Sequence, residues 1–283
     1  MLRRARPLLG TFVEIAASAA DPETERRACD VAFEAIADVH RLMSFHEPGS
    51  DVSRLNRIAH RRPLEVDPRT FTVLRRALEM SRLSRGAFDC TVGARMVELG
   101  LLPGRVRSTV RGDHRDVELD AEGRVRFRRR LAIDLGGIAK GFAVDQAVAA
   151  LQRAGADAGC VNAGGDLRVF GDRAWPIALR RPDAARRLVP LPPLRDRALA
   201  TSADSFVAGG HLLDPATGRP RRRPQSVSVI AASCMDADAL TKVVWLSEQV
   251  PHRLLERMDA HAILLGCLED SAPTPDGALR AAG

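Results

Sequence analysis

The sequence contains no tyrosine, and aromatic residues make up only 4% of its 283 residues. Proteins that bind single-stranded nucleic acids stack the bases on aromatic side chains, and such platforms are scarce here. The net charge of +7 permits nucleic-acid binding, but it equally suits an anionic cofactor. Arginine-rich runs such as 126–130 are typical of solvated surfaces. We therefore expect no nucleic-acid partner.

Long apolar runs are also absent. No stretch reaches the ~18–20 apolar residues that a membrane-spanning helix requires. The N-terminus has a basic start, but the short apolar run that follows is typical of a strand, and neither a signal-peptide cleavage site nor a lipobox is seen. The sequence therefore predicts no membrane span, and we expect the protein in the cytoplasm.

The cysteines are few and scattered, and none forms a C-x-x-C pair. The five are Cys29, Cys90, Cys160, Cys234 and Cys267. A zinc site or a disulfide framework would need a closer spacing or a regular pattern. Buried, reduced thiols are the simpler interpretation.

Lysine is nearly missing. Of 43 lysine and arginine residues, only Lys140 and Lys242 are lysine. The sequence uses arginine wherever a generic positive charge suffices, so a retained lysine is a candidate for a site that needs a compact ammonium group. Both lysines fall within glycine-rich or acidic segments that resemble functional motifs.

Hydrophobic periodicity indicates alternating helices and strands without the regular spacing of β-α-β units, which favours an α+β fold over a doubly wound sheet. The predicted helices are 21–43, 51–57, 67–85, 138–154, 236–247 and 251–258. The predicted strands are 10–18, 117–119, 124–127, 131–134, the two halves of 159–169, 225–232 and 260–266. Loops or irregular connections are expected at 86–93, 182–197 and 210–220.

The segment 131–145, LAIDLGGIAKGFAVD, has a predicted strand, two glycines and the start of a helix. Backbone N–H groups at a helix N-terminus favour an anion, and glycine lets a phosphate come close. Lys140 in the first turn is within reach of a phosphate oxygen. The segment is neither a Walker loop nor a G-x-G-x-x-G fingerprint, and a tight turn with a surface lysine is the alternative.

Three further segments carry candidate chemistry. CVNAGGDLRVFG at 160–171 predicts either a ligand-binding loop or a plain hairpin turn. GHLLDPATGRP at 210–220 contains His211, a general-base candidate or a structural histidine. SCMDADALTKVVWL at 233–246 places Asp238 and Lys242 on one helix face, as a surface ion pair or a partly buried one.

Taken together, eight segments in order resemble the ApbE-type flavin transferases, from about residue 9 to residue 266. The segments are LGTFVEI, MSFHEPGSDVSRLN, GAFDCTVG, DLGGIAKGFAVD, VNAGGDLRVFG, ATSADSF, HLLDPATG and DADALTK. The resemblance implies a single α+β unit over residues 1–283, built from a duplicated, T-fold-like α/β motif with mixed or antiparallel sheets and packed helices. The tail at 271–283 is expected to be frayed.

The resemblance also implies an enzyme that uses FAD as its donor substrate, with a magnesium ion at the pyrophosphate. It would transfer FMN to a Thr or Ser hydroxyl of an acceptor flavoprotein and release AMP. Two alternatives keep the fold: a non-catalytic FAD-binding or storage protein, and an FAD pyrophosphate hydrolase that yields FMN and AMP.

Site residues follow from matching positions. Leu9 corresponds to a family methionine that touches the flavin, and His46 to a tyrosine that stacks on the cofactor. The other expected cofactor-binding residues are Ala87, Phe88, Asp89, Asp134 and Lys140. The expected metal ligands are the carbonyl of Gly137 and the carboxylate of Asp238. His211 corresponds to the base that activates the acceptor hydroxyl.

One departure affects the metal. The family pattern has threonine four residues after its aspartate ligand, and this sequence has Lys242 there. Thr241 lies one residue early, about 100° away around a helix. An ammonium at this position can take the place of the metal and bind the pyrophosphate itself. We therefore count Lys242 among the cofactor-binding residues and expect a weakened or absent magnesium requirement.

Overall fold

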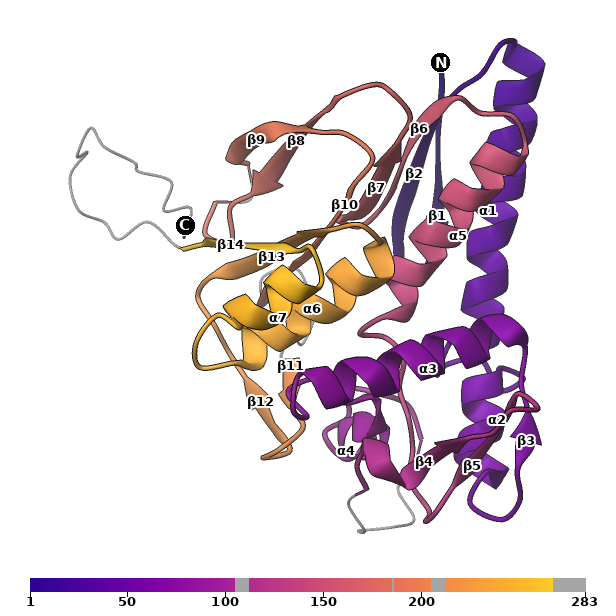
Figure 1. Cartoon of the computed structure of the whole chain (residues 1–283), viewed down its shortest axis with the longest axis vertical. Coiled ribbons are helices and arrows are strands. Elements are labelled where there is room, and N and C mark those ends of the chain that lie inside the picture. The colour runs from indigo at the N-terminus through magenta and orange to yellow at the C-terminus, as the bar shows by residue number, and fades with distance from the viewer. Residues whose placement is uncertain (105–111, 185, 205–211, 267–283) are drawn as a thin grey trace, which may run out of the picture.

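Seven strands form one antiparallel sheet in the part of the chain that the computed structural model describes, residues 1–104, 112–184, 186–204 and 212–266 (Figure 1). In spatial order they are β1 (Leu2–Leu8), β2 (Thr11–Ser18), β6 (Ala158–Ala163), β7 (Asp166–Phe170), β10 (Ala198–Ser202), β13 (Ser226–Ala231) and β14 (His261–Leu265). Each neighbouring pair runs antiparallel. The α+β prediction is confirmed.

Helices and smaller sheets complete the fold. The helices are α1 (Pro22–Met43), α2 (Asp51–Ile58), α3 (Pro68–Leu83), α4 (Gly93–Glu98), α5 (Ala139–Arg153), α6 (Cys234–Leu246) and α7 (His252–Arg257). The smaller sheets pair β3 (Leu64–Glu65) and β4 (Val117–Leu119) with β5 (Arg124–Phe127), β8 (Trp175–Arg180) with β9 (Leu188–Leu194), and β11 (Leu212–Asp214) with β12 (Arg219–Arg221). Among the described residues, no helix is both long and apolar enough to cross a membrane.

Both faces of the large sheet carry buried residues. Successive strand residues point to opposite faces, so Ile15 and Ala17 of β2 join the main core, while Ala16 packs with the β8–β9 ribbon. Helices α1, α5 and α6 supply the main core. Figure 1 shows α1 and α5 side by side against the sheet, with the β8–β9 ribbon away from them.

Local sequence explains where the principal helices begin. Asp21 precedes α1 and its carboxylate accepts hydrogen bonds from the N–H groups of Glu23 and Thr24, both at 2.9 Å. Ser233 caps α6 in the same way, through the N–H of Asp236 at 3.1 Å. Short polar side chains at this position satisfy donors that the helix leaves unpaired. The Ser233 cap starts α6 two residues before the predicted 236.

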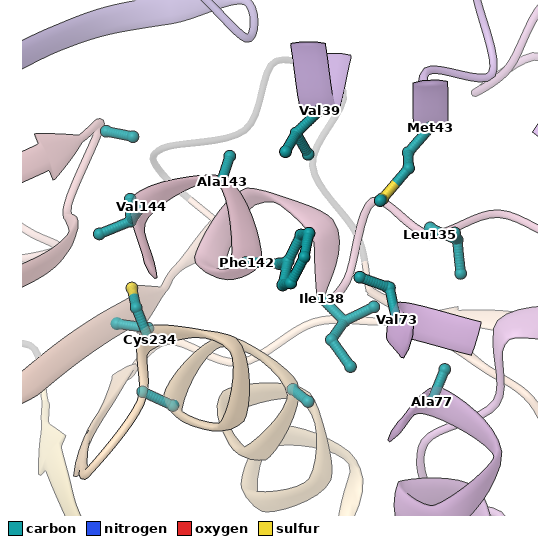
Figure 2. Packing of buried hydrophobic residues seen from close by; sticks show 14 of the residues in the cluster. Val39, Met43, Val73, Ala77, Leu135, Ile138, Phe142, Ala143, Val144 and Cys234 are labelled. Carbon is teal, nitrogen blue, oxygen red and sulfur yellow. The ribbon is translucent and has the colours of Figure 1, made fainter. Parts of the chain in front are cut away.

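The start of α5 is enclosed by helices α1 and α3 (Figure 2). Figure 2 shows Phe142 and Ile138 beside Val39 and Met43 of α1 and Val73 of α3. All five side chains are at most 5% exposed. Tight packing of this kind tolerates little positional error, so it fixes the glycine turn that leads into α5.

Gly141 sets the distance between α5 and α6. A Cβ atom at this position would lie 2.6 Å from the carbonyl carbon of Cys234 and 2.8 Å from Cβ of Asp238. We expect Gly141→Ala to lower the free energy of unfolding by about 1–3 kcal/mol, because a packed core accommodates an added methyl group only by straining its neighbours. Urea unfolding measures this change.

Gly49 provides the matched control. A Cβ atom there has no neighbour within 4 Å, so Gly49→Ala is expected to leave stability nearly unchanged. Equal stabilities of the two variants would contradict the close helix approach at Gly141.

The predicted strand at 131–134 is wrong. Its backbone groups bond elsewhere: the N–H of Ile133 donates to Oδ1 of Asn56 at 2.8 Å, and its carbonyl accepts from Nδ2 of Asn56 at 2.9 Å. The N–H of Asp134 donates to the carbonyl of Cys90 at 2.8 Å. A side chain and a loop therefore replace the neighbouring strand that the apolar pattern led us to expect.

Three predicted loops contain regular structure. The irregular connection at 182–197 holds β9, whose prolines are tolerated because a two-stranded ribbon leaves backbone positions without ladder partners. Residues 212–221 form the β11–β12 hairpin. The loop at 86–93 leads through a short helical turn into α4, which the sequence did not predict.

Candidate functional site

Three segments that the sequence assigned to one site meet at Gly137. A Cβ atom at Gly137 would lie 3.3 Å from Cε2 of Phe88 and 3.8 Å from Cε of Lys242. The glycine turn, the loop at 87–89 and helix α6 are therefore neighbours. The small size of Gly137 leaves room for the Lys242 stem and the Phe88 ring on the same side of the turn.

The first ion pair of the site joins α5 to β7. Lys140 Nζ lies 3.0 Å from Oδ2 of Asp166, which is 1% exposed. The N–H of Thr201 donates to the other oxygen of Asp166 at 3.3 Å. Burial opposes the charge on Lys140, but the carboxylates of Asp166 and Asp238 raise its pKa well above the ordinary lysine value.

The second ion pair lies within α6. Lys242 Nζ bonds Oδ1 of Asp238, a residue with no exposed surface. The N–H of Gly141 donates to Oδ2 of Asp238 at 3.0 Å, so the carboxylate also ties α6 to α5. The predicted side-chain pair is thus a partly buried one, whereas the alternative was an ion pair on the surface.

Together Lys140, Asp166, Asp238 and Lys242 form a charged quartet with no net charge. The pKa of Asp166 is raised by burial and by the nearby charge of Asp238, while both lysines act in the opposite direction. The side chains of Lys140 and Lys242 are 32% and 14% exposed, whereas both carboxylates are buried. The positive groups are therefore the part of the quartet that a solvent-borne anion meets.

Asp134 starts the glycine turn and has no ion-pair partner within 4 Å among the described residues. Its Oδ2 accepts the N–H of Gly136 at 3.1 Å. Burial raises the pKa of Asp134, while the Gly136 hydrogen bond and the nearby charge of His46 lower it. The His46 side chain is exposed. Because its charge acts on Asp134, the two residues expected to contact the cofactor lie near each other.

The raised pKa of Asp134 has a testable consequence. A carboxyl group whose pKa is higher in the folded state weakens stability as the pH rises from its ordinary pKa through the folded value. Asp134→Asn removes this loss, so the stability of the variant relative to the wild type is expected to increase between about pH 4 and pH 7. Urea unfolding across this range measures it.

Asp21 gives the control of opposite sign, because hydrogen bonds from Thr24 lower its pKa. Asp21→Asn is expected to lose stability relative to the wild type as the pH rises from about 2 to about 5, and to differ from it by a constant amount at higher pH. A pH-independent difference between Asp134→Asn and the wild type would contradict the raised pKa.

Both oxygens of the Asp89 carboxylate accept hydrogen bonds from other groups of the protein. Oδ1 accepts the N–H and the hydroxyl of Thr91 at 2.9 and 2.8 Å. Oδ2 accepts the N–H of His114 at 3.0 Å and lies 3.1 Å from its Nδ1. Asp89 therefore shapes the loop that presents Ala87 and Phe88, both of which pack against the main core.

Leu9 occupies the turn between β1 and β2. Its φ angle is +54°, and that of Gly10 is +69°. Leu9 packs partly against the main core. A Cβ at Gly164 would lie 3.0 Å from Cγ2 of Thr11, which places the Gly-Gly turn of β6–β7 beside this hairpin. The ion pairs of the quartet do not include Leu9, and His211 lies outside the described residues.

Sequence reasoning missed Asp166 and Asp145. Asp145 of α5 accepts the N–H groups of Cys234 and Met235, both at 2.9 Å, and so holds the start of α6. Arg168 pairs with Asp145 at 2.8 Å. The scarcity of lysine could have pointed to a residue such as Asp166. A lysine retained in a partly buried site requires an acidic partner to balance its charge.

The donor set does not fit a magnesium ion. Magnesium prefers oxygen ligands in a regular octahedron. Both oxygens of Asp238 already have partners, Lys242 and Gly141. The described residues also contain no group of three or more His, Cys, Asp or Glu side chains that could hold a metal.

Comparison with known proteins shows which family this chain resembles. The model of the ApbE family matches residues 9–264. An FAD:protein FMN transferase from Vibrio cholerae is 32% identical over 249 residues, 78% of this chain and 72% of the relative. One from Rhodobacter capsulatus is 30% identical over 281 residues, 91% of this chain, which spans about half (54%) of that relative.

Solved structures show the same fold. The flavin transferase ApbE from Vibrio cholerae superposes with a TM-score of 0.81 at 27% identity and covers 95% of this chain and 94% of its own. The ApbE protein from Thermotoga maritima gives a TM-score of 0.78 at 29% identity, with 95% and 96% covered. The chain therefore belongs to the ApbE family.

Proposed function

We propose that this protein is an FAD:protein FMN transferase. The observation that carries the proposal is the meeting of the Phe88 loop, the Gly137 turn and the Lys242 helix in a chain of the ApbE family. Relatives of this chain bear the name FAD:protein FMN transferase. Two ammonium groups beside a glycine turn at a helix start suit the pyrophosphate of FAD.

The reaction exchanges one phosphorus–oxygen bond for another. A Thr or Ser hydroxyl of an acceptor flavoprotein attacks the FMN phosphorus of FAD, and the bond to the AMP phosphate breaks. AMP leaves with the electron pair of that bond, and the hydroxyl proton passes to a base. His211 is our candidate for this base, by its place in the family pattern.

The remaining residues bind and orient the donor. Lys140 and Lys242 would stabilise the charge that builds on the phosphate oxygens in the transition state. Phe88 and Ala87, with the exposed ring of His46, would hold the aromatic parts of FAD, and Leu9 would contact the flavin. Asp134 would accept hydrogen bonds from the cofactor. We further propose that residues 1–283 form one functional unit that acts in the cytoplasm.

Incubation with FAD and a candidate acceptor protein tests the function, with AMP measured by chromatography and flavin attachment by mass spectrometry. AMP release that requires the acceptor, together with an acceptor heavier by one FMN, is the expected result. AMP without an acceptor would indicate a hydrolase. FAD that stays bound and intact beside a competent acceptor would indicate storage. Either of these results would overturn the proposal.

A further inference from the structure

We propose that the ammonium group of Lys242 permanently replaces the magnesium ion that family members hold at the FAD pyrophosphate, so that this protein binds FAD without a metal. The inference rests on the proposed function, because FAD is the ligand that it concerns. Three features of the site support it: the contacts of Asp238, those of Thr241, and the charge of the quartet.

The Asp238 carboxylate is already saturated. It is completely buried, its Oδ2 accepts the N–H of Gly141 at 3.0 Å, and its Oδ1 bonds Lys242 Nζ. Because Asp238 is completely buried, a metal ion at Oδ1 would have to displace the ammonium group. The four-residue spacing keeps Lys242 above Asp238 on the same helix face, so the pair forms within one turn of α6.

Thr241 does not supply the missing ligand. Its side chain is buried, and its hydroxyl donates to the carbonyl of Asp238 at 2.7 Å. The same oxygen lies 2.8 Å from the hydroxyl oxygen of Ser202 on β10. These contacts turn Thr241 toward the sheet. The threonine that the family pattern places at position 242 therefore has no substitute one residue earlier.

The net charge of the quartet also argues against a bound magnesium ion. With Lys242 in place, two carboxylates face two ammonium groups and the quartet is neutral. A threonine at position 242 would leave a net charge of −1 in a buried site, which attracts a cation. A divalent ion added beside Lys242 would instead meet a like charge at close range. The stem of Lys242 lies beside the Gly137 turn, and the side chain keeps 14% of its surface exposed to an anion.

FAD binding to the whole protein, followed by flavin fluorescence with EDTA or with added magnesium, tests the inference without relying on turnover. The expected result is the same Kd for FAD in both buffers and no heat of magnesium binding by calorimetry. A Kd at least about tenfold weaker in EDTA and restored by magnesium would overturn it, since that factor corresponds to the loss of one charge-assisted contact.

Two substitutions at one position sharpen the test. Lys242→Thr restores the family's ligand, and we expect its affinity for FAD to become magnesium-dependent by about tenfold or more. Lys242→Met provides neither a charge nor a ligand, and it is expected to bind FAD weakly in both buffers. The proposal would be contradicted if Lys242→Met bound FAD as tightly as the wild type does. It would also be contradicted if the affinity of Lys242→Thr for FAD did not change with magnesium.

The two proposals fail separately. Wild-type protein that binds FAD equally in EDTA but never releases AMP with a competent acceptor would refute the transferase function and leave the role of Lys242 intact. Wild-type protein that transfers FMN only with magnesium, and loses FAD affinity in EDTA, would refute the role of Lys242 and leave the transferase function intact.

Discussion

Replacing Lys140 with methionine is expected to lower the free energy of unfolding by about 3 kcal/mol, because the substitution leaves a buried carboxylate without its cation. Asp166 is 1% exposed, and Lys140 Nζ lies 3.0 Å from its Oδ2. Asp238 also acts on Lys140 but keeps Lys242 as its own partner, so the substitution leaves the rest of the quartet with one net negative charge. Urea unfolding at neutral pH, followed by circular dichroism, gives the measurement.

The choice of pH follows from the sign of the pKa shift. The pKa of Lys140 is raised in the folded protein, so its contribution to stability is complete below the ordinary lysine pKa and disappears only as the pH rises through the folded value. Neutral pH therefore measures the whole contribution.

Two variants control for other causes. Lys140→Met combined with Asp166→Asn removes both charges and is expected to recover most of the lost stability. Arg124→Met breaks the Arg124–Asp120 pair, whose side chains are 50% and 33% exposed. It is expected to change stability by less than about 1 kcal/mol. A loss in Lys140→Met no larger than that in Arg124→Met would show that the quartet contributes little.

Replacing His211 with alanine is expected to slow acceptor-dependent AMP release by about 10²–10⁴-fold, because general-base catalysis contributes that range. The affinity for FAD should stay within about twofold of the wild type, since the proposed base acts on the acceptor hydroxyl. Single-turnover AMP release and flavin fluorescence give the two measurements.

His261 of β14 is the matched control, because it is exposed and stands on an edge strand of the large sheet. His261→Ala is expected to release AMP at the wild-type rate. If His211→Ala also kept that rate, another group would have to take the hydroxyl proton.

Much of the site was predictable because its signals are local. Glycines before a helix predict an anion-binding turn, and four-residue spacing predicts that Asp238 and Lys242 share a face. The near absence of lysine marked Lys140 and Lys242 before any contact was known. The predicted helix at 21–43 begins within one residue of α1, whose N-cap is Asp21.

The sequence by itself determined the α+β class, the main helices and most strands of the large sheet, since these depend on periodicity and capping within a few residues. Only the tertiary structure decided which partners the charges take. Asp166 lies 26 residues from Lys140, and Gly141 lies 97 residues from the carboxylate it binds. The side chain of Asn56, 77 residues away, likewise bonds the backbone N–H and carbonyl of Ile133 and so prevents a strand there. Such pairings depend on how α5, α6 and β7 pack together, and hydrophobic patterns do not encode that geometry.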